Sequence, residues 1–293
     1  MKINEDEIIK YIEENFGFGK VVGEPIFPKQ GMSSAVFFLE FEDNLEVAVK
    51  YGNNVKKDFD FLSLISENKN KVPVPKVFGY FEIGKTQIIL LEKINGVLLG
   101  EIEKEYLLEY FSEIKNTLDE LHKIKKENVN WKEYLLNIFN GKTLDWEEVS
   151  KRKLLDGELV KISVENILNK INKLDFPVQK FSLLHTDFNQ RNLMVNINEK
   201  KIVGVIDWEE ATFGDPLYDF ARFKLHLWHR EVEEKCVQDF LNLLNLNEEE
   251  INKMNLYFNI FVLQYLAYYS EKENEFNLSR ISKHQDYLVK CKV

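Results

Sequence analysis

The chain has 293 residues, of which 44% are hydrophobic and 13% aromatic, and its formal net charge is −10 at pH 7. This length and composition predict a globular protein with one large or two modest domains. The acidic balance argues against nucleic acid or an anionic membrane surface as a partner, and it favours a cationic small-molecule substrate. The two cysteines lack metal or disulfide spacing and the acidic start does not resemble a signal peptide, so we expect a cytoplasmic protein.

The first third of the chain has mainly the patterns of strands. Apolar residues at helical spacing, including Ile8 and Ile12, predict a helix at its start. Alternating apolar runs separated by turn residues follow, and Pro73 and Pro75 break the chain after a second helix. The expected elements are strands at 35–41 and 45–51, a helix at 55–68, and strands at 77–83 and 86–94. Together they predict a β-rich N-terminal lobe of residues 1–94.

The rest of the chain, residues 95–293, is mostly helical in pattern. Leu107, Leu108, Phe111 and Ile114 begin an apolar face with helical spacing. Short β-type runs at 192–197 and 202–207 interrupt the helices and predict a hairpin. The sequence therefore predicts an α+β protein with two lobes.

Three oxygen-bearing side chains are expected to converge at this hairpin. Its polar turn is centred between residues 199 and 200, so residues equally distant from that point should lie opposite each other. This symmetry places Asn192 opposite Asp207, and Asp187 lies in the loop that enters the hairpin. An amide oxygen and carboxylates suit a hard cation, and magnesium carrying phosphate oxygens is the common occupant of such a partial site.

The segments HTDFNQRN (residues 185–192) and VGVIDW (residues 203–208) resemble the aminoglycoside phosphotransferase family. Relatives of that family are the choline kinases and, more distantly, the protein kinases. The resemblance implies the two-lobed protein-kinase-like fold, with a nucleotide-binding lobe at 1–94 and a catalytic and substrate-binding lobe at 95–293. The run IDWEEATFGD is similar to the hygromycin kinase branch.

The same resemblance implies roles for the motif residues. Asp187 is expected to orient the substrate hydroxyl or accept its proton, and Asn192 and Asp207 are expected to hold the metal. His185 is expected to support the catalytic loop through hydrogen bonds. Asp215, with Asp219 behind it, resembles the acid that braces the loop in similar family members.

In the N-terminal lobe, the run EVAVK (residues 46–50) resembles the strand whose lysine grips the nucleotide phosphates. Ala48 and Lys50 share a face of a strand, so a small side chain can cover the adenine while the ammonium reaches the phosphates. An acid on the next helix should pair with Lys50. Asp58 has the better register and Asp60 is the second choice.

Two further segments resemble nucleotide-binding parts of the family. Gly31, Ser33 and Ser34 lie where relatives have a phosphate-covering loop, whose backbone amides and hydroxyls can cap phosphate oxygens. Glu92 and Ile94 lie at the lobe change, where the family contacts the purine mainly through backbone groups. The expected cofactors are ATP and Mg²⁺, and GTP is not excluded.

Two other functions fit these residues less well. A protein kinase needs a long activation segment after the metal-binding Asp, whereas Asp215 follows Asp207 by only eight residues. A non-catalytic nucleotide-binding module would not need the complete set of catalytic and metal residues. The sequence indicates no obligate protein partner.

The predicted substrate is an aminoglycoside-type antibiotic, which would connect the protein to antibiotic resistance. The stretch 207–219 holds five acids and no Lys or Arg, and Glu209 and Glu210 are the expected contacts to a cationic substrate. The alternatives are kinases of choline or ethanolamine, of homoserine, or of a sugar, all on the same fold.

Overall fold

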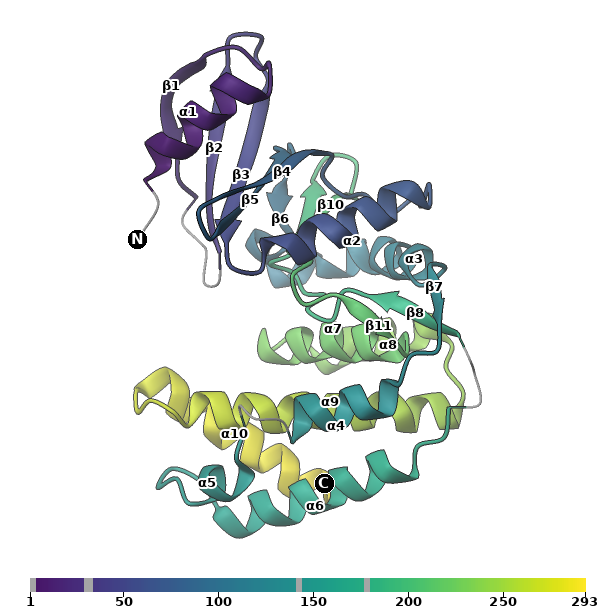
Figure 1. Cartoon of the computed structure of the whole chain (residues 1–293). Coiled ribbons are helices and arrows are strands. Elements are labelled where there is room, and N and C mark those ends of the chain that lie inside the picture. The colour runs from purple at the N-terminus through teal and green to yellow at the C-terminus, as the bar shows by residue number, and fades with distance from the viewer. Residues whose placement is uncertain (1–3, 29–33, 141–143, 177–179) are drawn as a thin grey trace. The chain divides into compact units, whose positions relative to one another are not determined.

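The computed structural model describes residues 4–28, 34–140, 144–176 and 180–293 (Figure 1). Contacts divide the chain into two compact units, Met1–Ile124 with Asn189–Ala211, and Lys125–Phe188 with Thr212–Val293. The hairpin predicted at 192–207 therefore belongs to the β-rich unit, as does the helical segment up to residue 124. The division of the lobes near residue 95 stays a prediction.

The described part of the first unit combines a five-stranded sheet, the hairpin and three α-helices. Its elements are α1 (Glu5–Asn15), β1 (Val21–Ile26), β2 (Ala35–Phe41), β3 (Glu46–Gly52), α2 (Val55–Glu67), β4 (Val77–Ile83), β5 (Thr86–Glu92), β6 (Val97–Leu98), the 3-10 turns Leu99–Glu101 and Lys104–Tyr110, α3 (Phe111–Leu121), β9 (Leu193–Asn196) and β10 (Lys201–Val205).

A five-stranded antiparallel sheet in the order β1-β2-β3-β5-β4 forms the centre of this unit. Successive side chains alternate between its faces, and Phe37, Val49 and Leu90 are fully buried on one of them. The amphipathic helix α1 packs there through Ile8 and Ile12, and Figure 1 shows it alongside the strands. The predicted strands at 35–41 and 77–83 are confirmed, whereas β1 was not predicted.

On the other face of the sheet, α2 covers part of β3, β4 and β5. The remainder carries a row of directly paired residues, Phe38, Ala48 and Leu91, which are only half-buried. One row further along, Lys50 is paired with Val36 and Ile89. Ala48 and Lys50 therefore share this partly open face.

The hairpin of β9 and β10 is present, but its register differs from the prediction. Lys201 lies opposite Asn196 and Val205 opposite Leu193, with an irregularity at Val203 between these pairs. The backbone N–H of Ile206 donates to the carbonyl of Asn192 at 3.0 Å. Asn192 is thus opposite Ile206, so the prediction that it faces Asp207 is wrong by one residue. The turn is tighter than predicted, which shifts the pairing of the two strands, and the extra residue at Val203 reverses only part of that shift.

The second unit is mainly helical and has a small sheet in the order β11-β8-β7. Its elements are β7 (Lys125–Glu127), α4 (Trp131–Phe139), α5 (Trp146–Ser150), α6 (Gly157–Lys173), β8 (Lys180–Leu184), β11 (Thr212–Gly214), α7 (Leu217–His229), α8 (Glu234–Leu244), α9 (Glu248–Tyr269) and α10 (Glu275–Cys291).

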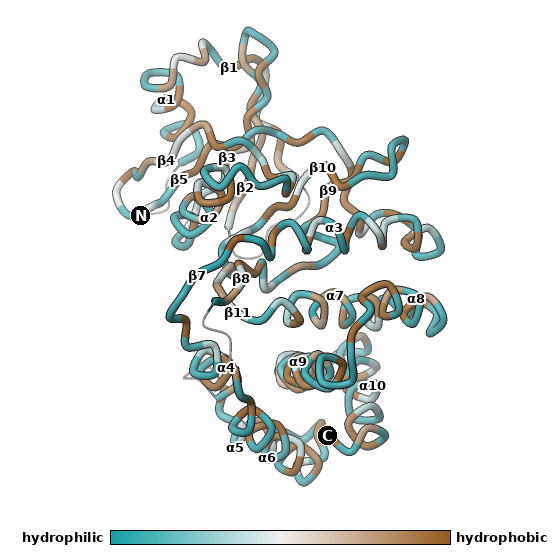
Figure 2. Tube along the Cα trace, turned by 90° about the vertical axis from the view of Figure 1, so that its right-hand side faces the viewer, coloured by the Kyte–Doolittle hydropathy of each residue, from teal (hydrophilic) through white to brown (hydrophobic). Residues whose placement is uncertain are grey.

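The core of the second unit lies around α9. This helix buries twelve of its 22 residues, and the other long helices pack against it. Figure 2 shows hydrophobic colour along much of its coil, as expected for a central helix. In the described part of the chain, no helix is long and apolar enough to cross a membrane.

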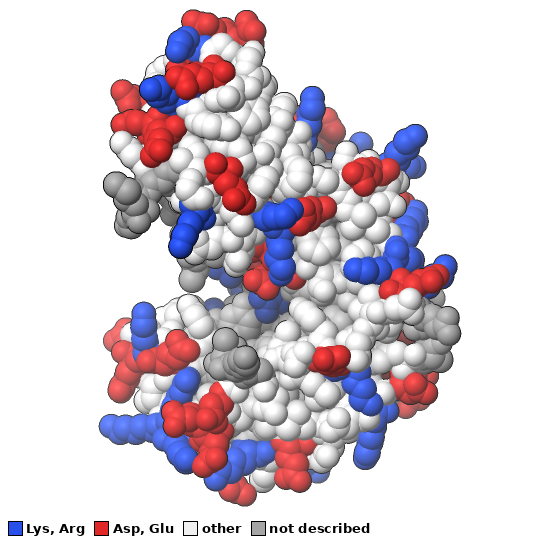
Figure 3. Space-filling view, viewed as in Figure 1, with Lys and Arg blue, Asp and Glu red and all other residues white. Residues whose placement is uncertain are grey.

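Charged side chains are distributed over the surface. In the face shown in Figure 3, Lys and Arg alternate with Asp and Glu on both units, and no large area of that face has a single sign.

Candidate functional site

Lys50 is the centre of a charged cluster in the first unit. Its Nζ lies 2.7 Å from Asp58 Oδ2, 2.7 Å from Asp207 Oδ1 and 3.9 Å from Glu209 Oε2. The lysine comes from β3, Asp58 from α2, and the other two acids from the segment after β10. Of the two acids predicted to pair with Lys50, Asp58 does so, whereas Asp60 pairs with Lys56 on the exposed side of α2.

Burial and charge act in opposite directions on this pair. Burial alone would lower the pKa of Lys50, but the carboxylates of Asp58 and Asp207 outweigh it, and the pKa is raised. Burial also raises the pKa of Asp58, and the ammonium of Lys50 offsets only part of that increase. Asp58 is further held by its Oδ1, which accepts a hydrogen bond from the backbone N–H of Trp208 at 2.6 Å.

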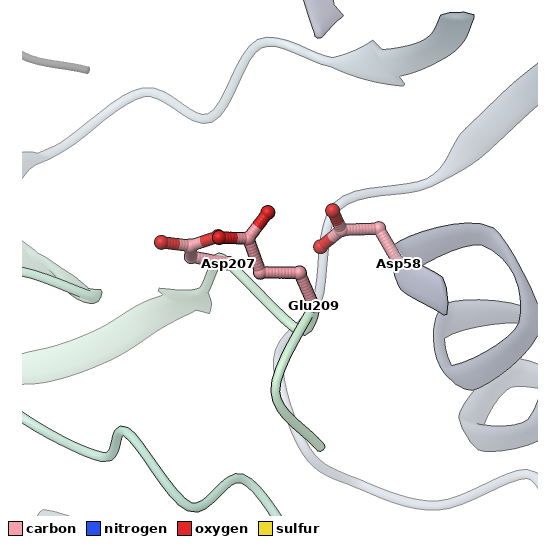
Figure 4. A group of neighbouring side chains, drawn as sticks. All are labelled: Asp58, Asp207 and Glu209. Atoms are coloured by element: carbon pink, nitrogen blue, oxygen red, sulfur yellow. The ribbon is translucent and has the colours of Figure 1, made fainter. Parts of the chain in front are cut away.

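The carboxylates of Asp58, Asp207 and Glu209 can each place an oxygen within 4.8 Å of the others. Figure 4 shows the three side chains, with Asp58 coming from its helix and the other two from the strand end. A donor set made only of carboxylate oxygens fits a hard divalent cation such as Mg²⁺. The Oγ of Ser34 also donates to Glu209 Oε2 at 3.1 Å.

Backbone geometry fixes the position of Asp207. It lies two residues after the end of β10 and has a φ of +69°, in the left-handed region that Asp adopts at some cost. Ile206, the residue before Asp207, donates its backbone N–H to the carbonyl of Asn192. The backbones of the two predicted metal residues therefore lie close together at the end of the hairpin. Asn192 is buried, whereas the Asp207 side chain is 37% exposed.

Of the residues predicted to contact the purine, Ala48 lies on the partly open face of the sheet, whereas Glu92 is paired with the buried Val47 of the other face. Ala48 is the small member of its row, between Phe38 and Leu91. Ile94 lies after β5 against Gly204, where an added Cβ would approach its Cδ1 to 2.3 Å. The carboxylate of Glu92 is turned back on its own strand pair and accepts from the N–H of Lys76 at 3.2 Å. Gly31 and Ser33 lie outside the described residues.

The residues of the predicted catalytic loop, which include His185, Thr186 and Asp187, lie in the second unit directly after β8. The backbone N–H groups of His185 and Thr186 donate to the two carboxylate oxygens of Asp219, at 3.0 and 2.8 Å. Thr186 has a φ of +64°, which a β-branched residue rarely adopts, and Asp219 stabilises this turn. The His185 ring is buried and packs edge-on against Phe188.

Asp219, rather than Asp215, thus holds the loop backbone. Asp215 Oδ1 accepts from the N–H of Leu217 at the start of α7, and its Oδ2 accepts from the Tyr257 hydroxyl at 3.0 Å. The Trp131 indole in turn donates to that hydroxyl. Asp215 therefore connects α7 with α9 and α4.

Sequence reasoning missed the partner of Asp187. Arg222 on α7 donates to Asp187 Oδ1 from Nη2 at 2.6 Å and from Nε at 3.1 Å. Burial alone would raise the pKa of Asp187, but the guanidinium beside it holds that pKa below its usual range. An arginine three residues after Asp219, within the apolar run FARF, was the available signal.

Sequence reasoning also assigned Glu209 to the substrate. Its carboxylate is buried, where it lies beside Lys50 and accepts a hydrogen bond from Ser34. Glu210 is exposed.

Several solved structures are similar to this chain. The crystal structure of aminoglycoside phosphotransferase APH(4)-Ia has a TM-score of 0.75 at 14% identity, over 98% of this chain and 99% of that chain. A thermostable mutant of it, in ternary complex with ADP and hygromycin B, has a TM-score of 0.73 at 16% identity, over 97% and 98%. The amicoumacin kinase hAmiN, in complex with AMP-PNP, Ca²⁺ and Ami, has a TM-score of 0.69 at 10% identity, over 98% and 93%.

A curated relative matches over a short stretch. Acyl-CoA dehydrogenase family member 11 of Homo sapiens is 40% identical over 52 residues, which are 17% of this chain and 7% of that protein. The match therefore covers only a small part of the relative's length.

The family model described as "Phosphotransferase enzyme family" matches residues 30–254, more than half of the chain. This range contains the Lys50 cluster, the hairpin, the catalytic loop and α7. The solved structures, whose identities are too low to show more than the fold, confirm the predicted α+β kinase-like fold. The chain belongs to the phosphotransferase enzyme family.

Proposed function

We propose that this protein transfers the γ-phosphoryl group of ATP to a hydroxyl of a small polar molecule, most specifically an aminoglycoside-type antibiotic. The observation that carries the first part is the Lys50 cluster beside a partly open sheet face. Phosphoryl transfer requires in-line positioning and neutralisation of phosphate charge, and little covalent chemistry from the protein.

Each group of residues has a proposed task. The face with Phe38, Ala48 and Leu91 receives the purine, because the small central side chain leaves room for a flat ring. Lys50 binds phosphate oxygens, and Asp58 fixes the direction of its ammonium. The charge-assisted contacts of Lys50 are stronger than neutral hydrogen bonds, so they position the ammonium firmly.

Asp207 and Asn192, with Glu209 as an additional carboxylate, would hold Mg²⁺. When bound, the ion supplies positive charge to the phosphates. Asp187 orients the acceptor hydroxyl as a hydrogen-bond acceptor. Since Arg222 lowers the pKa of Asp187 and so makes its carboxylate a weaker base, we expect orientation to matter more than proton abstraction.

The proposal of an aminoglycoside as acceptor is supported by the motif resemblance and by the related protein that was solved with hygromycin B. The exposed Glu210 can attract an amino group, whereas Glu209 has its place beside Lys50. Amino alcohols, homoserine and sugars are the competing acceptors.

Measurement of ADP release tests both parts of the proposal, the phosphoryl transfer from ATP and the aminoglycoside as acceptor. Purified protein with Mg-ATP is assayed against matched panels of aminoglycosides, amino alcohols, homoserine and neutral sugars, and products are identified by mass spectrometry. Turnover of a member of the first panel, with addition of one phosphate, is the expected result. Turnover confined to another panel would reject an aminoglycoside as the acceptor. If no panel and not even water as the acceptor led to ADP release, the proposed kinase activity would be rejected.

A further inference from the structure

One face of α7 contacts three successive residues of the catalytic loop. Asp219 accepts the backbone N–H groups of His185 and Thr186, and Arg222, three residues later on the helix, binds the side chain of Asp187. Residues three apart lie on the same face of a helix, so the two contacts act from one rigid surface. This arrangement fixes both the backbone and the carboxylate of the loop.

Arg222 is itself held from behind by α9. Its guanidinium lies 5.0 Å from the ring centroid of Phe261 and 5.2 Å from that of Tyr265. Its Nη2 also donates to the Tyr265 hydroxyl at 3.2 Å. Aromatic faces attract a guanidinium, and the planar fork loses little freedom per bond formed, so the position of Arg222 is well defined.

Both hydrogen bonds from Arg222 go to the same oxygen of Asp187, Oδ1. Two charge-assisted donors on one oxygen fix the position of that oxygen more firmly than a single donor would. The direction in which Asp187 accepts a hydrogen bond from an acceptor hydroxyl is then set by α7 and α9.

We propose that Arg222 is a positioning residue for phosphoryl transfer, which orients the Asp187 carboxylate through its two hydrogen bonds. This inference rests on the function proposed above for Asp187. Arg222 acts through Asp187, and its loss is expected to reduce kcat rather than the affinity for ATP, because the Lys50 cluster belongs to the other compact unit.

Several groups contribute to the electrostatic environment of Asp187. Arg222 and His226 come from α7 and His185 from the loop itself, and Tyr265 of α9 lies behind the arginine. Arg222 has the largest effect among the charges. Without Arg222, burial would raise the pKa of Asp187 with less opposing charge, so the carboxyl should take up a proton at higher pH.

The test compares Arg222→Met and Arg222→Lys with a matched control, Lys224→Met. Lys224 is also on α7 and binds Asn255 and the Phe258 ring of α9, but it is not a partner of Asp187. ADP release is measured between pH 5 and 9 with Mg-ATP alone and with any acceptor found in the panels, and ATP binding is measured by calorimetry.

Arg222→Met should lower kcat by about 10- to 100-fold, as expected when a reacting group is misplaced, and leave the KM for ATP almost unchanged. The acid limb of its kcat profile should move up by about 1–3 pH units, the usual effect of an adjacent opposite charge. Arg222→Lys should keep the acid limb near its wild-type position and recover kcat only in part, because lysine cannot reproduce the fork. Lys224→Met should behave as wild type.

If Arg222→Met fails to fold, Arg222→Lys and Tyr265→Phe, which removes only the hydroxyl behind the arginine, still report the kcat loss. A folded Arg222→Met with a wild-type kcat and acid limb would overturn the inference and leave the proposed function intact. Wild-type protein that releases no ADP under any condition would overturn the proposed function and this role together.

Discussion

Replacing Lys50 with Met removes the positive charge that faces Asp58, Asp207 and Glu209 in the cluster. Asp58 and Asp207 each lose a cation at 2.7 Å, and Glu209 loses one at 3.9 Å. Breaking a buried ion pair from one side costs about 3–5 kcal/mol. Because the Asp207 side chain is 37% exposed, water screens part of the effect, and we expect a loss near 3 kcal/mol in the free energy of unfolding.

The loss should depend on pH in a defined direction. Without the ammonium, burial raises the pKa of Asp58 further above that of the unfolded chain. A carboxyl whose folded pKa is raised costs stability above its unfolded pKa. The deficit of Lys50→Met relative to wild type should thus be largest at pH 8 and should narrow as the pH falls and Asp58 binds a proton.

Urea unfolding of a double-mutant cycle measures this effect. Asp58→Asn keeps an Oδ1 acceptor for the Trp208 N–H but removes the charge, so adding it to Lys50→Met should recover at least about 1 kcal/mol. Lys56→Met, which breaks the exposed pair with Asp60, is the control and should cost less than about 0.5 kcal/mol. A loss below 1 kcal/mol for Lys50→Met, with no coupling to Asp58, would refute the reasoning.

Four further predictions concern the proposed reaction and the loop that supports it. Asp187→Ala should bind Mg-ATP normally by calorimetry but lose at least about 100-fold in kcat, and a variant that retains a tenth of the rate would contradict its role. Asp207→Ala should lose magnesium-dependent nucleotide binding, with poor rescue at high Mg²⁺, so an unchanged Mg-ATP affinity would contradict the metal assignment. Asp219→Ala leaves two loop N–H groups without their acceptor and should cost about 2–4 kcal/mol in urea unfolding. Glu210→Gln should raise the KM for an aminoglycoside more than it lowers kcat, and the wild-type KM should rise with salt, whereas a salt-independent KM would count against a cationic acceptor.

The sequence alone was sufficient for the features that depend on local patterns. Apolar runs bounded by turn residues located β2 and β4 at their observed bounds, and in β2 the residues of one face are buried. β1 was not found, since the run VVGEPI contains Gly and Pro and has no clear alternation. The segments HTDFNQRN and VGVIDW resemble those of a phosphotransferase family, and the family model agrees.

Tertiary structure decided the contacts between residues far apart in the chain. It selected Asp58 over Asp60 as the partner of Lys50, since only Asp58 is on the buried side of α2. It turned Glu209 into the Lys50 cluster and brought Arg222 to Asp187. It also moved Asn192 opposite Ile206, because an irregular residue in a strand shifts the register in a way that symmetry about a turn cannot predict. Periodicity fixes which face of an element is buried, but the partner that this face meets depends on how whole elements pack.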